Sequence, residues 1–240
     1  MRRDTLKKAG QAISDLYRRY GLWPRTCLTC GIVGKSPICL NCRQELEPIS
    51  PGCQQCANPQ VHQDAAECAW CARLDSLPER TLAVYAYRNR GRDVFHWVKY
   101  RGYWRLLDPL CSGVDSVWNA SFGDWGRPAL VPIPESFSRR WRRQFNPAGQ
   151  IGLRLAERGF GEVKPLLRIR WFQPSMVGMD YKARRKNAKK RFVVCRREVP
   201  KSAILIDDVM TTGATMEAAT KALKKAGVLR IGWFTLFRTL

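Results

Sequence analysis

Runs of apolar residues alternate with helix-spaced repeats over the C-terminal two-thirds of the chain. Residues 203–206 are all apolar, which is typical of a buried parallel strand. In residues 215–226, Met216, Ala219 and Leu223 recur on one helical face, and Gly227 follows where a helix would end. The pattern predicts a strand, a turn and a helix in direct succession.

Other segments continue this alternation. Residues 82–87, 129–134, 192–195 and 229–237 are typical of strands, and helices are expected at 93–99, 103–118 and 147–158. Pro109 must interrupt or begin a helix, and the last helix carries apolar surface at Ile151, Leu153 and Leu155. The predicted fold class is α/β, with a parallel, doubly wound sheet flanked by helices.

The turn after residues 203–206 carries the most informative chemistry. Asp207 and Asp208 end the expected strand, where α/β sheets bind ligands, and they can hold a sugar diol or Mg²⁺ through water. Backbone N–H groups of the next helix favour an anion there. The predicted ligand has a phosphate at one end and vicinal hydroxyls at the other, and the alternative is a structural turn whose acids cap the helix. The candidate binding residues are Asp207, Asp208, Val209, Thr211, Thr212, Gly213, Ala214 and Thr215.

Eight of the ten cysteines form four Cys-x-x-Cys pairs, and two such pairs complete a tetrahedral zinc site. We expect two structural Zn²⁺ ions, which would supply folding energy to a segment with little apolar periodicity. A cross-braced pairing, redox-active pairs and a disulfide framework are the alternatives. The simplest assignment gives Cys27, Cys30, Cys39 and Cys42 to one ion and Cys53, Cys56, Cys68 and Cys71 to the other, with Cys111 and Cys195 as core residues.

Charge divides the chain into three parts. The total net charge is +22, of which residues 1–26 carry +5, residues 27–78 carry −2 and residues 79–240 carry +19. We therefore expect a basic N-terminal helical arm, a double zinc ribbon and an α/β domain over these ranges. No apolar stretch is long enough for a transmembrane segment, and residues 1–25 have no secretory core. A cytoplasmic protein is expected, with peripheral contact of the arm with the inner membrane left open.

The basic excess of the α/β domain is densest at residues 139–143 and 182–191. Cations there suit a pyrophosphate group, and the second run is also a candidate for a loop over the site. Basic residues interleaved with aromatic ones equally suit single-stranded nucleic acid, although such runs are often solvated faces. The candidate contacts are Lys99, Arg142, Arg143, Arg184 and Arg185, with nearby aromatics at Trp97, Tyr100, Tyr103, Trp104, Trp141 and Tyr181.

The motif Asp-Asp-Val-x-Thr-Thr-Gly-x-Thr at 207–215 resembles the phosphoribosyl pyrophosphate (PRPP) motif of type I phosphoribosyltransferases. With the four cysteine pairs, the chain from Cys27 onward resembles the competence protein F (ComF) family, which includes GntX-like proteins. Family members usually carry Arg-Gly-Phe-Asn-Gln where this chain has Arg-Gln-Phe-Asn-Pro at 143–147. Further matching segments are Lys99-Tyr100, Val131-Pro132-Ile133-Pro134, Phe145-Asn146, Arg168-x-Arg170, the run from Arg185-x-Asn187 to Phe192, and Phe237-Arg238-Thr239-Leu240.

This resemblance implies a type I phosphoribosyltransferase fold behind a double zinc ribbon. In that reading Asp207 and Asp208 are the catalytic acids that hold the ribose hydroxyls and Mg²⁺, and residues 211–215 anchor the 5′-phosphate. It also implies a part in natural transformation, in which incoming single-stranded DNA is handled at the inner membrane with a helicase partner.

Three functions follow from these observations. The first is a PRPP-binding competence protein that contacts single-stranded DNA, and the second is an active phosphoribosyltransferase of unknown acceptor. The third is a non-catalytic adaptor whose zinc ribbon binds a helicase or another protein. Enzymatic turnover is left open because no general base is identifiable; His62 and His96 suit surface or packing roles better.

Overall fold

The computed structural model describes residues 26–50, 52–59, 68–135, 145–170 and 192–240. Its centre is a five-stranded sheet in which every neighbouring pair is parallel. This confirms the predicted α/β fold class. The strand order is β1 (Arg80–Ala86), β7 (Arg230–Arg238), β6 (Ser202–Met210), β2 (Ala129–Pro132) and β3 (Glu162–Val163).

Strands β6 and β7 occupy interior positions of the sheet, and their apolar sequences match that burial. All residues of β7 after Arg230 are buried, as are residues 203–206 of β6. The register between β2 and β6 pairs Pro132 with Ile206. The carboxyl ends of these two strands therefore lie side by side, so the residues that follow each strand meet at one edge of the sheet.

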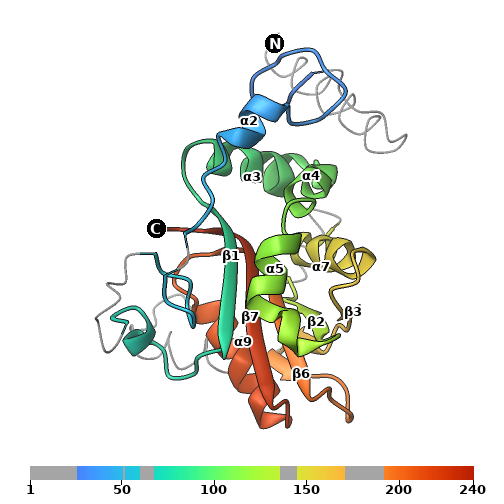
Figure 1. The fold of residues 1–240 in the computed structure, drawn as a ribbon. Helices are drawn as coiled ribbons and strands as arrows, with labels where there is room; N and C mark the ends of the chain where they lie inside the picture. Colours follow the sequence, from blue (N-terminus) through green and yellow to red (C-terminus); the bar gives the residue numbers. More distant parts are fainter. Residues whose placement is uncertain (1–25, 51, 60–67, 136–144, 171–191) are drawn as a thin grey trace, which may run out of the picture.

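Helices cover both faces of the sheet (Figure 1), which confirms the doubly wound arrangement. One face packs against α3 (Asn89–Arg101), α5 (Asp115–Phe122) and α7 (Pro147–Glu157). The opposite face packs against α9 (Ala214–Lys225), which begins directly after the turn that follows β6. Residues such as Ile151 and Leu223, both fully buried, show how the predicted apolar stripes face the sheet.

The expected helix at 103–118 is broken into shorter pieces. They are η2 (Trp104–Leu106), α4 (Leu107–Cys111) and α5, and η3 (Gly123–Trp125) follows α5. Pro109 lies in the first turn of α4, where its missing N–H would have no helical partner. Of the two predicted positions for this proline, the structure shows the second: it lies near the beginning of a helix.

The strand predicted at 192–195 is confirmed as β5 (Phe192–Val194), which pairs antiparallel with β4 (Leu167–Ile169) outside the main sheet. Two details of the sequence interpretation are wrong. Leu153 is 46% exposed, because a residue two positions after Ile151 in a helix points to nearly the opposite face. Cys195 is exposed as well, because it lies just beyond the end of β5.

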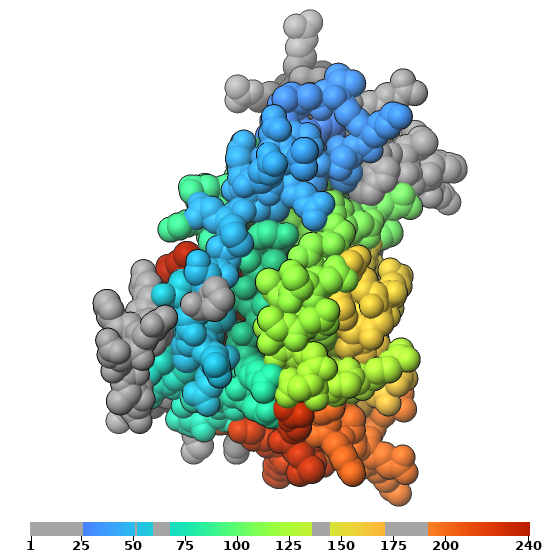
Figure 2. All heavy atoms as spheres, viewed as in Figure 1, coloured from blue at the N-terminus to red at the C-terminus, as the bar shows by residue number. Residues whose placement is uncertain are grey.

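The cysteine-containing segment covers the free edge of the sheet. The Ile49 N–H donates to the Val84 carbonyl at 2.9 Å, and Thr81 donates to Gln54 at 2.8 Å, so this stretch runs beside β1. Figure 2 shows residues 26–50 and 52–58 lying over the surface of the α/β domain. An edge strand covered in this way is protected from pairing with other chains. The segment also contains α2 (Leu40–Gln44) and η1 (Cys71–Arg73), whereas the expected arm lies outside the described residues except Thr26.

Candidate functional site

A polar pocket of about 260 Å³ lies at the edge where β2 and β6 end. Its walls come from the end of α3, the residues after β2, the start of α7, the end of β6, the turn that follows it and the start of α9. This is the edge at which parallel sheets bind ligands. The lining residues are Lys99, Ile133, Pro134, Glu135, Asn146, Ala148, Asp207, Asp208, Val209, Thr211 and Thr215.

The two predicted acids lie together in this pocket with one of the predicted cations. The Lys99 Nζ lies 3.3 Å from an oxygen of Asp208, and both side chains are largely buried. Burial, followed by the nearby charge of Asp208, raises the pKa of Asp207 well above its ordinary value. The two acids of the pocket therefore differ: Asp208 is paired with a cation, whereas Asp207 is costly to ionise.

The side chains of the acids do not cap α9. Asp207 Oδ1 accepts from the Asp208 N–H at 2.9 Å, and Asp208 Oδ1 accepts from the Val209 N–H at 2.8 Å. Both contacts are local to the end of β6. This geometry disfavours the alternative in which the acid pair is only a structural helix cap, and the second oxygen of Asp208 pairs with Lys99 instead.

The turn that follows brings a helix N-terminus to the same pocket. Gly213 precedes α9 with a φ of 72°, a conformation that glycine adopts at little cost. Thr211 and Thr215 line the cavity, and the Thr212 hydroxyl accepts from the Ala214 N–H at 3.5 Å. The positive end of α9 and the hydroxyls on either side of it together suit an anion.

Two groups of the pocket were missed from the sequence. Asn146 caps α7 by accepting from the Ala148 N–H at 3.1 Å, and its Nδ2 donates to the Ile133 carbonyl at 2.9 Å. This side chain ties the start of a second helix to the end of β2. Glu135 adds a third carboxylate to the wall. The positions of these residues in the sequence could have indicated both. Glu135 lies shortly after the strand β2, Asn146 lies directly before the helix α7, and both elements reach this edge of the sheet.

The predicted cysteine grouping is found in the structure. Cys27, Cys30, Cys39 and Cys42 form the first Cys₄ group, and Cys53, Cys56, Cys68 and Cys71 form the second. Within each group the sulfur atoms all lie within 4.8 Å of one another. The two groups pair sequentially rather than in a cross-braced arrangement.

The sulfur separations fit a tetrahedral metal site. Cys53 and Cys71 are 3.5 Å apart, as are Cys56 and Cys68, and Cys30 and Cys39 are 3.7 Å apart. Zinc–sulfur bonds of about 2.3 Å in a tetrahedron place sulfurs about 3.8 Å apart, whereas a disulfide requires about 2.05 Å. Either group could therefore hold Zn²⁺, and four thiolates leave no open position for catalysis.

The two groups contact different parts of the α/β domain. The first packs near α3 and α4 (Figure 1), where Arg43 donates to the Ser112 hydroxyl at 3.0 Å and Glu45 pairs with Arg90 at 2.6 Å. The second packs with Trp70 and Leu77. Trp70 also contacts the core on the α9 side of the sheet.

Comparisons with known proteins agree with this arrangement. A family model described as "Phosphoribosyl transferase domain" matches residues 200–240, which contain β6, the turn, α9 and β7. Competence protein ComFC of Bacillus subtilis is 28% identical over 84% of this chain and 84% of its own length. Competence protein F of Haemophilus influenzae is 24% identical over 86% of this chain and 92% of its own length. DNA utilization protein YhgH of Escherichia coli K12 is 23% identical over 90% of this chain and 98% of its own length.

The resemblance to the competence protein F family is confirmed. It rests on similarity over most of the chain, on the phosphoribosyltransferase domain and on the two Cys₄ groups. Within this ComF-like chain, the motif that carries the resemblance forms one wall of the polar pocket. Four of the predicted contacts, Arg142, Arg143, Arg184 and Arg185, lie outside the described residues, as do Trp141 and Tyr181.

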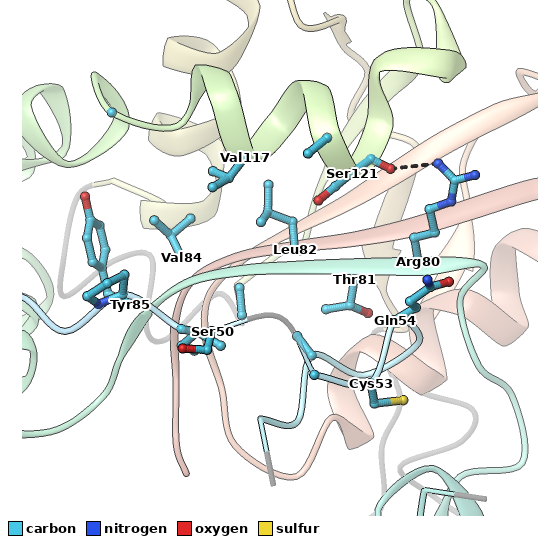
Figure 3. A pocket seen from close by; sticks show the side chains of 17 residues that line it. Ser50, Cys53, Gln54, Arg80, Thr81, Leu82, Val84, Tyr85, Val117 and Ser121 are labelled. Atoms are coloured by element: carbon cyan, nitrogen blue, oxygen red, sulfur yellow. Dashed lines mark hydrogen bonds between the residues drawn. The ribbon is translucent and has the colours of Figure 1, made fainter. Parts of the chain in front are cut away.

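A larger cavity of about 550 Å³ lies elsewhere in this ComF-like structure, between the stretch that covers β1, β1 itself and α5. Figure 3 shows apolar side chains such as Leu82, Val84 and Val117 around it. Its charged residue, Arg80, donates to the Ser121 carbonyl at 3.0 Å and to Asp124 at 2.6 Å. The two cavities share no lining residue, so the acids and threonines of the motif belong to the smaller one.

Among the described residues of this ComF-like chain, no helix combines the length and the apolar character that crossing a membrane requires.

Proposed function

We propose that the polar pocket binds PRPP or a related ribose phosphate together with Mg²⁺. The observation that carries this proposal is that the acid pair and the start of α9 line one pocket. Thr211 and Thr215, with the backbone of the turn, would hold the 5′-phosphate. Asp207 and Asp208 would accept hydrogen bonds from the ribose hydroxyls and hold the hydrated cation.

The pyrophosphate end of the ligand would face Lys99 and the start of α7. Among the described residues that line the pocket, Lys99 carries the positive charge. The N-terminus of α7 adds a second positive helix end beside that of α9. Pro147 has no N–H to offer, and the Ala148 N–H already donates to Asn146. Charge rather than backbone donors would therefore bind pyrophosphate on this side. Mg²⁺, when bound with PRPP, would neutralise part of the pyrophosphate charge.

Binding of PRPP is distinct from its catalytic turnover. In a phosphoribosyl transfer, the bond from the anomeric carbon to pyrophosphate breaks and a bond to an acceptor forms. The protein would contribute position and charge stabilisation, since the transition state resembles an oxocarbenium ion. Release of pyrophosphate from PRPP, followed with a panel of nucleobases and amines, would distinguish an active transferase from a binding protein.

The test of the binding proposal is a calorimetric titration of zinc-loaded protein with Mg²⁺–PRPP. The double variant Asp207→Asn/Asp208→Asn should lose binding, because it removes both carboxylates while keeping their size. Asp124→Asn is the matched control, since this exposed carboxylate pairs with Arg80 away from the pocket. No binding by intact protein, or equal binding by the double variant, would contradict the proposal.

We further propose a role in DNA uptake or utilisation. The relatives' names, competence protein and DNA utilization protein, support this role. A surface of this chain offers groups for contact with single-stranded DNA: around the end of α3, Arg101 lies over Trp97 at 5.7 Å and Arg105 over Trp104 at 5.2 Å. Guanidinium and indole groups together bind phosphates and stacked bases.

Trp104→Ala tests this contact directly. Base stacking on an aromatic residue contributes about 1–3 kcal/mol, so loss of Trp104 should weaken binding of an oligothymidylate by about fivefold or more. Trp125→Ala is less suitable as a control because Trp125 is buried, whereas Val117→Ala removes a side chain that is exposed elsewhere on the surface. Unchanged affinity of the Trp104 variant would show that DNA, if bound, uses another surface.

The adaptor function is the second candidate, and one observation favours it. The first Cys₄ group exposes Ile32 (58%), Val33 (78%) and Leu40 (68%) together on the same segment. Exposed apolar residues on a rigid metal-binding turn suit a protein partner, and the resemblance implies the competence helicase. Val33→Asp should abolish co-purification with that helicase while both zinc ions remain; retained co-purification would rule out this surface.

A further inference from the structure

Trp70 connects the second Cys₄ group to the phosphate-binding turn. It lies between two ligands of that group in the sequence, Cys68 and Cys71, and packs against the group in the structure. Its ring also lies directly against Gly213: a Cβ at this glycine would lie 2.4 Å from the Trp70 Cη2 atom. The turn that would bind phosphate therefore rests on a side chain of the cysteine-containing segment.

A buried cation lies over the ring of Trp70. Arg238, the last residue of β7, is only 2% exposed, and its guanidinium carbon lies 4.5 Å from the centre of the Trp70 ring. Its Nε and Nη1 have no hydrogen-bond partner among the described residues. A buried, incompletely paired guanidinium is costly unless an opposite charge lies nearby.

The second Cys₄ group supplies that charge when it holds zinc. Four thiolates around Zn²⁺ carry a net charge of about −2. All four cysteines of the group lie within electrostatic reach of Arg238. With zinc bound, the buried cation and the metal site would each offset part of the other's charge, and Trp70 contacts both.

A second connection joins the same segment to α9. The Asp75 N–H donates to Glu217 at 2.9 Å, and Glu217 lies in the first turn of α9 with 6% exposure. Lys221 bridges both carboxylates, at 2.6 Å from Glu217 and 2.9 Å from Asp75. Lys224 donates to the Leu77 carbonyl at 3.1 Å. The segment that follows the second Cys₄ group is therefore fixed to the helix whose N-terminus lines the pocket.

We propose that zinc in the second Cys₄ group, through Trp70 and Arg238, positions the turn at residues 211–215, so that occupancy of this metal site and affinity for the ribose phosphate are coupled. The first Cys₄ group has no such connection among the described residues: its contacts are with α3, α4 and Ser112, which follows α4. The affinity part of this proposal rests on the proposed function, whereas the positioning of the turn does not.

Two single-ligand variants provide a matched comparison. Cys53→Ser removes a ligand of the second group and Cys39→Ser a ligand of the first, and both cysteines are partly buried. Each should lower the zinc content from two ions toward one. Only Cys53→Ser should speed amide hydrogen exchange at residues 209–217, by about tenfold, a coupling of the usual size between linked sites. Equal exchange at these residues in the two variants would overturn the proposal.

Variants of the connecting side chains test the same link with both metal sites intact. Trp70→Ala should keep two zinc ions yet speed exchange at residues 209–217, and Trp70→Phe should restore most of the protection because an aromatic ring still contacts Gly213. Arg238→Met should release zinc to a chelator faster than Arg238→Lys, which keeps the charge. Zinc release at the same rate from both variants would remove Arg238 from the proposal.

Ligand binding is measured last, so that the two proposals fail separately. Exchange and zinc release are recorded without ligand and report on the turn alone. If wild-type protein binds Mg²⁺–PRPP, Trp70→Ala should weaken that binding by about tenfold while Cys39→Ser does not. Absence of PRPP binding by wild type would refute the proposed ligand, whereas unchanged affinity in Trp70→Ala would refute the coupling.

Discussion

At the scale of single residues, the pocket is defined by the unequal environments of its charges. Lys99 pairs with Asp208 at 3.3 Å, while Asp207 is buried beside that second carboxylate and has a raised pKa. A cation that neutralises one acid leaves the pocket able to accept both a hydrated metal ion and an anionic ligand. The residue types are those of the motif, but their pairing depends on α3, which brings Lys99 from more than a hundred residues away.

Lys99→Gln should weaken Mg²⁺–PRPP binding by about tenfold, the usual effect of losing one hydrogen bond to a charged group. Lys164→Gln is the control, since this lysine pairs with Glu162 at 3.1 Å on the surface and does not line the pocket. The measurement is calorimetric titration of both variants. Equal losses in the two variants would indicate a general effect of net charge rather than a contact of Lys99.

The raised pKa of Asp207 predicts a pH dependence of stability. The folded protein holds this proton to higher pH than the unfolded chain, whose Asp residues titrate at about pH 3.9. The contribution of Asp207 is therefore fully present below that pH and is lost as pH rises through the folded-state pKa. Urea unfolding should show wild type losing stability relative to Asp207→Asn as pH rises; parallel curves would contradict the assignment.

At the scale of elements, the site depends on where strands and helices end. The carboxyl ends of β2 and β6 are brought side by side by parallel pairing, and α7 and α9 both begin at that edge. Asn146 links the start of α7 to the residues after β2, and Gly213 makes the turn into α9 against Trp70. Small displacements of either helix start would change the anion site, because helix-end effects act within about one turn.

Gly213→Ala should destabilise the fold more than Gly159→Ala. Both glycines have positive φ, 72° and 83°, so each alanine costs about 1–2 kcal/mol of backbone strain. At Gly159 a Cβ meets nothing within 4 Å, whereas at Gly213 it meets the Trp70 ring at 2.4 Å. Thermal unfolding gives the comparison, and PRPP binding should fall only for Gly213→Ala. Equal destabilisation would mean that the Trp70 side chain moves away from the new Cβ without lowering the stability of the fold.

At the scale of the whole molecule, the cysteine-containing segment is part of the α/β domain's surface rather than a separate appendage. It covers the edge of β1, packs one Cys₄ group near α3 and α4, and packs the other next to the turn before α9. The strong positive charge, by contrast, belongs to the α/β domain. The candidate metal ligands and the excess of positive charge therefore belong to different parts of the chain.

Replacing Arg184, Arg185, Lys189 and Lys190 together by Gln should reduce the salt dependence of single-stranded DNA binding. Each lost phosphate contact lowers the slope of log affinity against log salt by about 0.7, so four contacts correspond to about 3. The measurement is a fluorescence titration of oligothymidylate at several salt concentrations. An unchanged slope would show that this run is a solvated surface.

Features formed by residues that are neighbours in the chain could be predicted before the fold was known. The strand–turn–helix at 203–226, the Cys-x-x-Cys pairs and a helix that begins near Pro109 were predicted, because local spacing sets strand and helix periodicity and the bite of a Cys-x-x-Cys pair. Sequential pairing was the simplest assignment, and the structure decided it against the cross-braced alternative. The acid pair and the turn were likewise predicted as binding residues from the sequence, before the groups around them were known.

Which groups from distant parts of the chain share a site follows from the packing of strands and helices. Lys99 and Asp208, Asn146 and Ile133, and Trp70 and Gly213 become neighbours through strand order and helix packing, which no local pattern encodes. The same applies to β5, which leaves the main sheet to pair with β4, and to the exposure of Leu153 and Cys195. Apolar character states that a side chain can be buried, whereas the packing of the other elements decides whether it is.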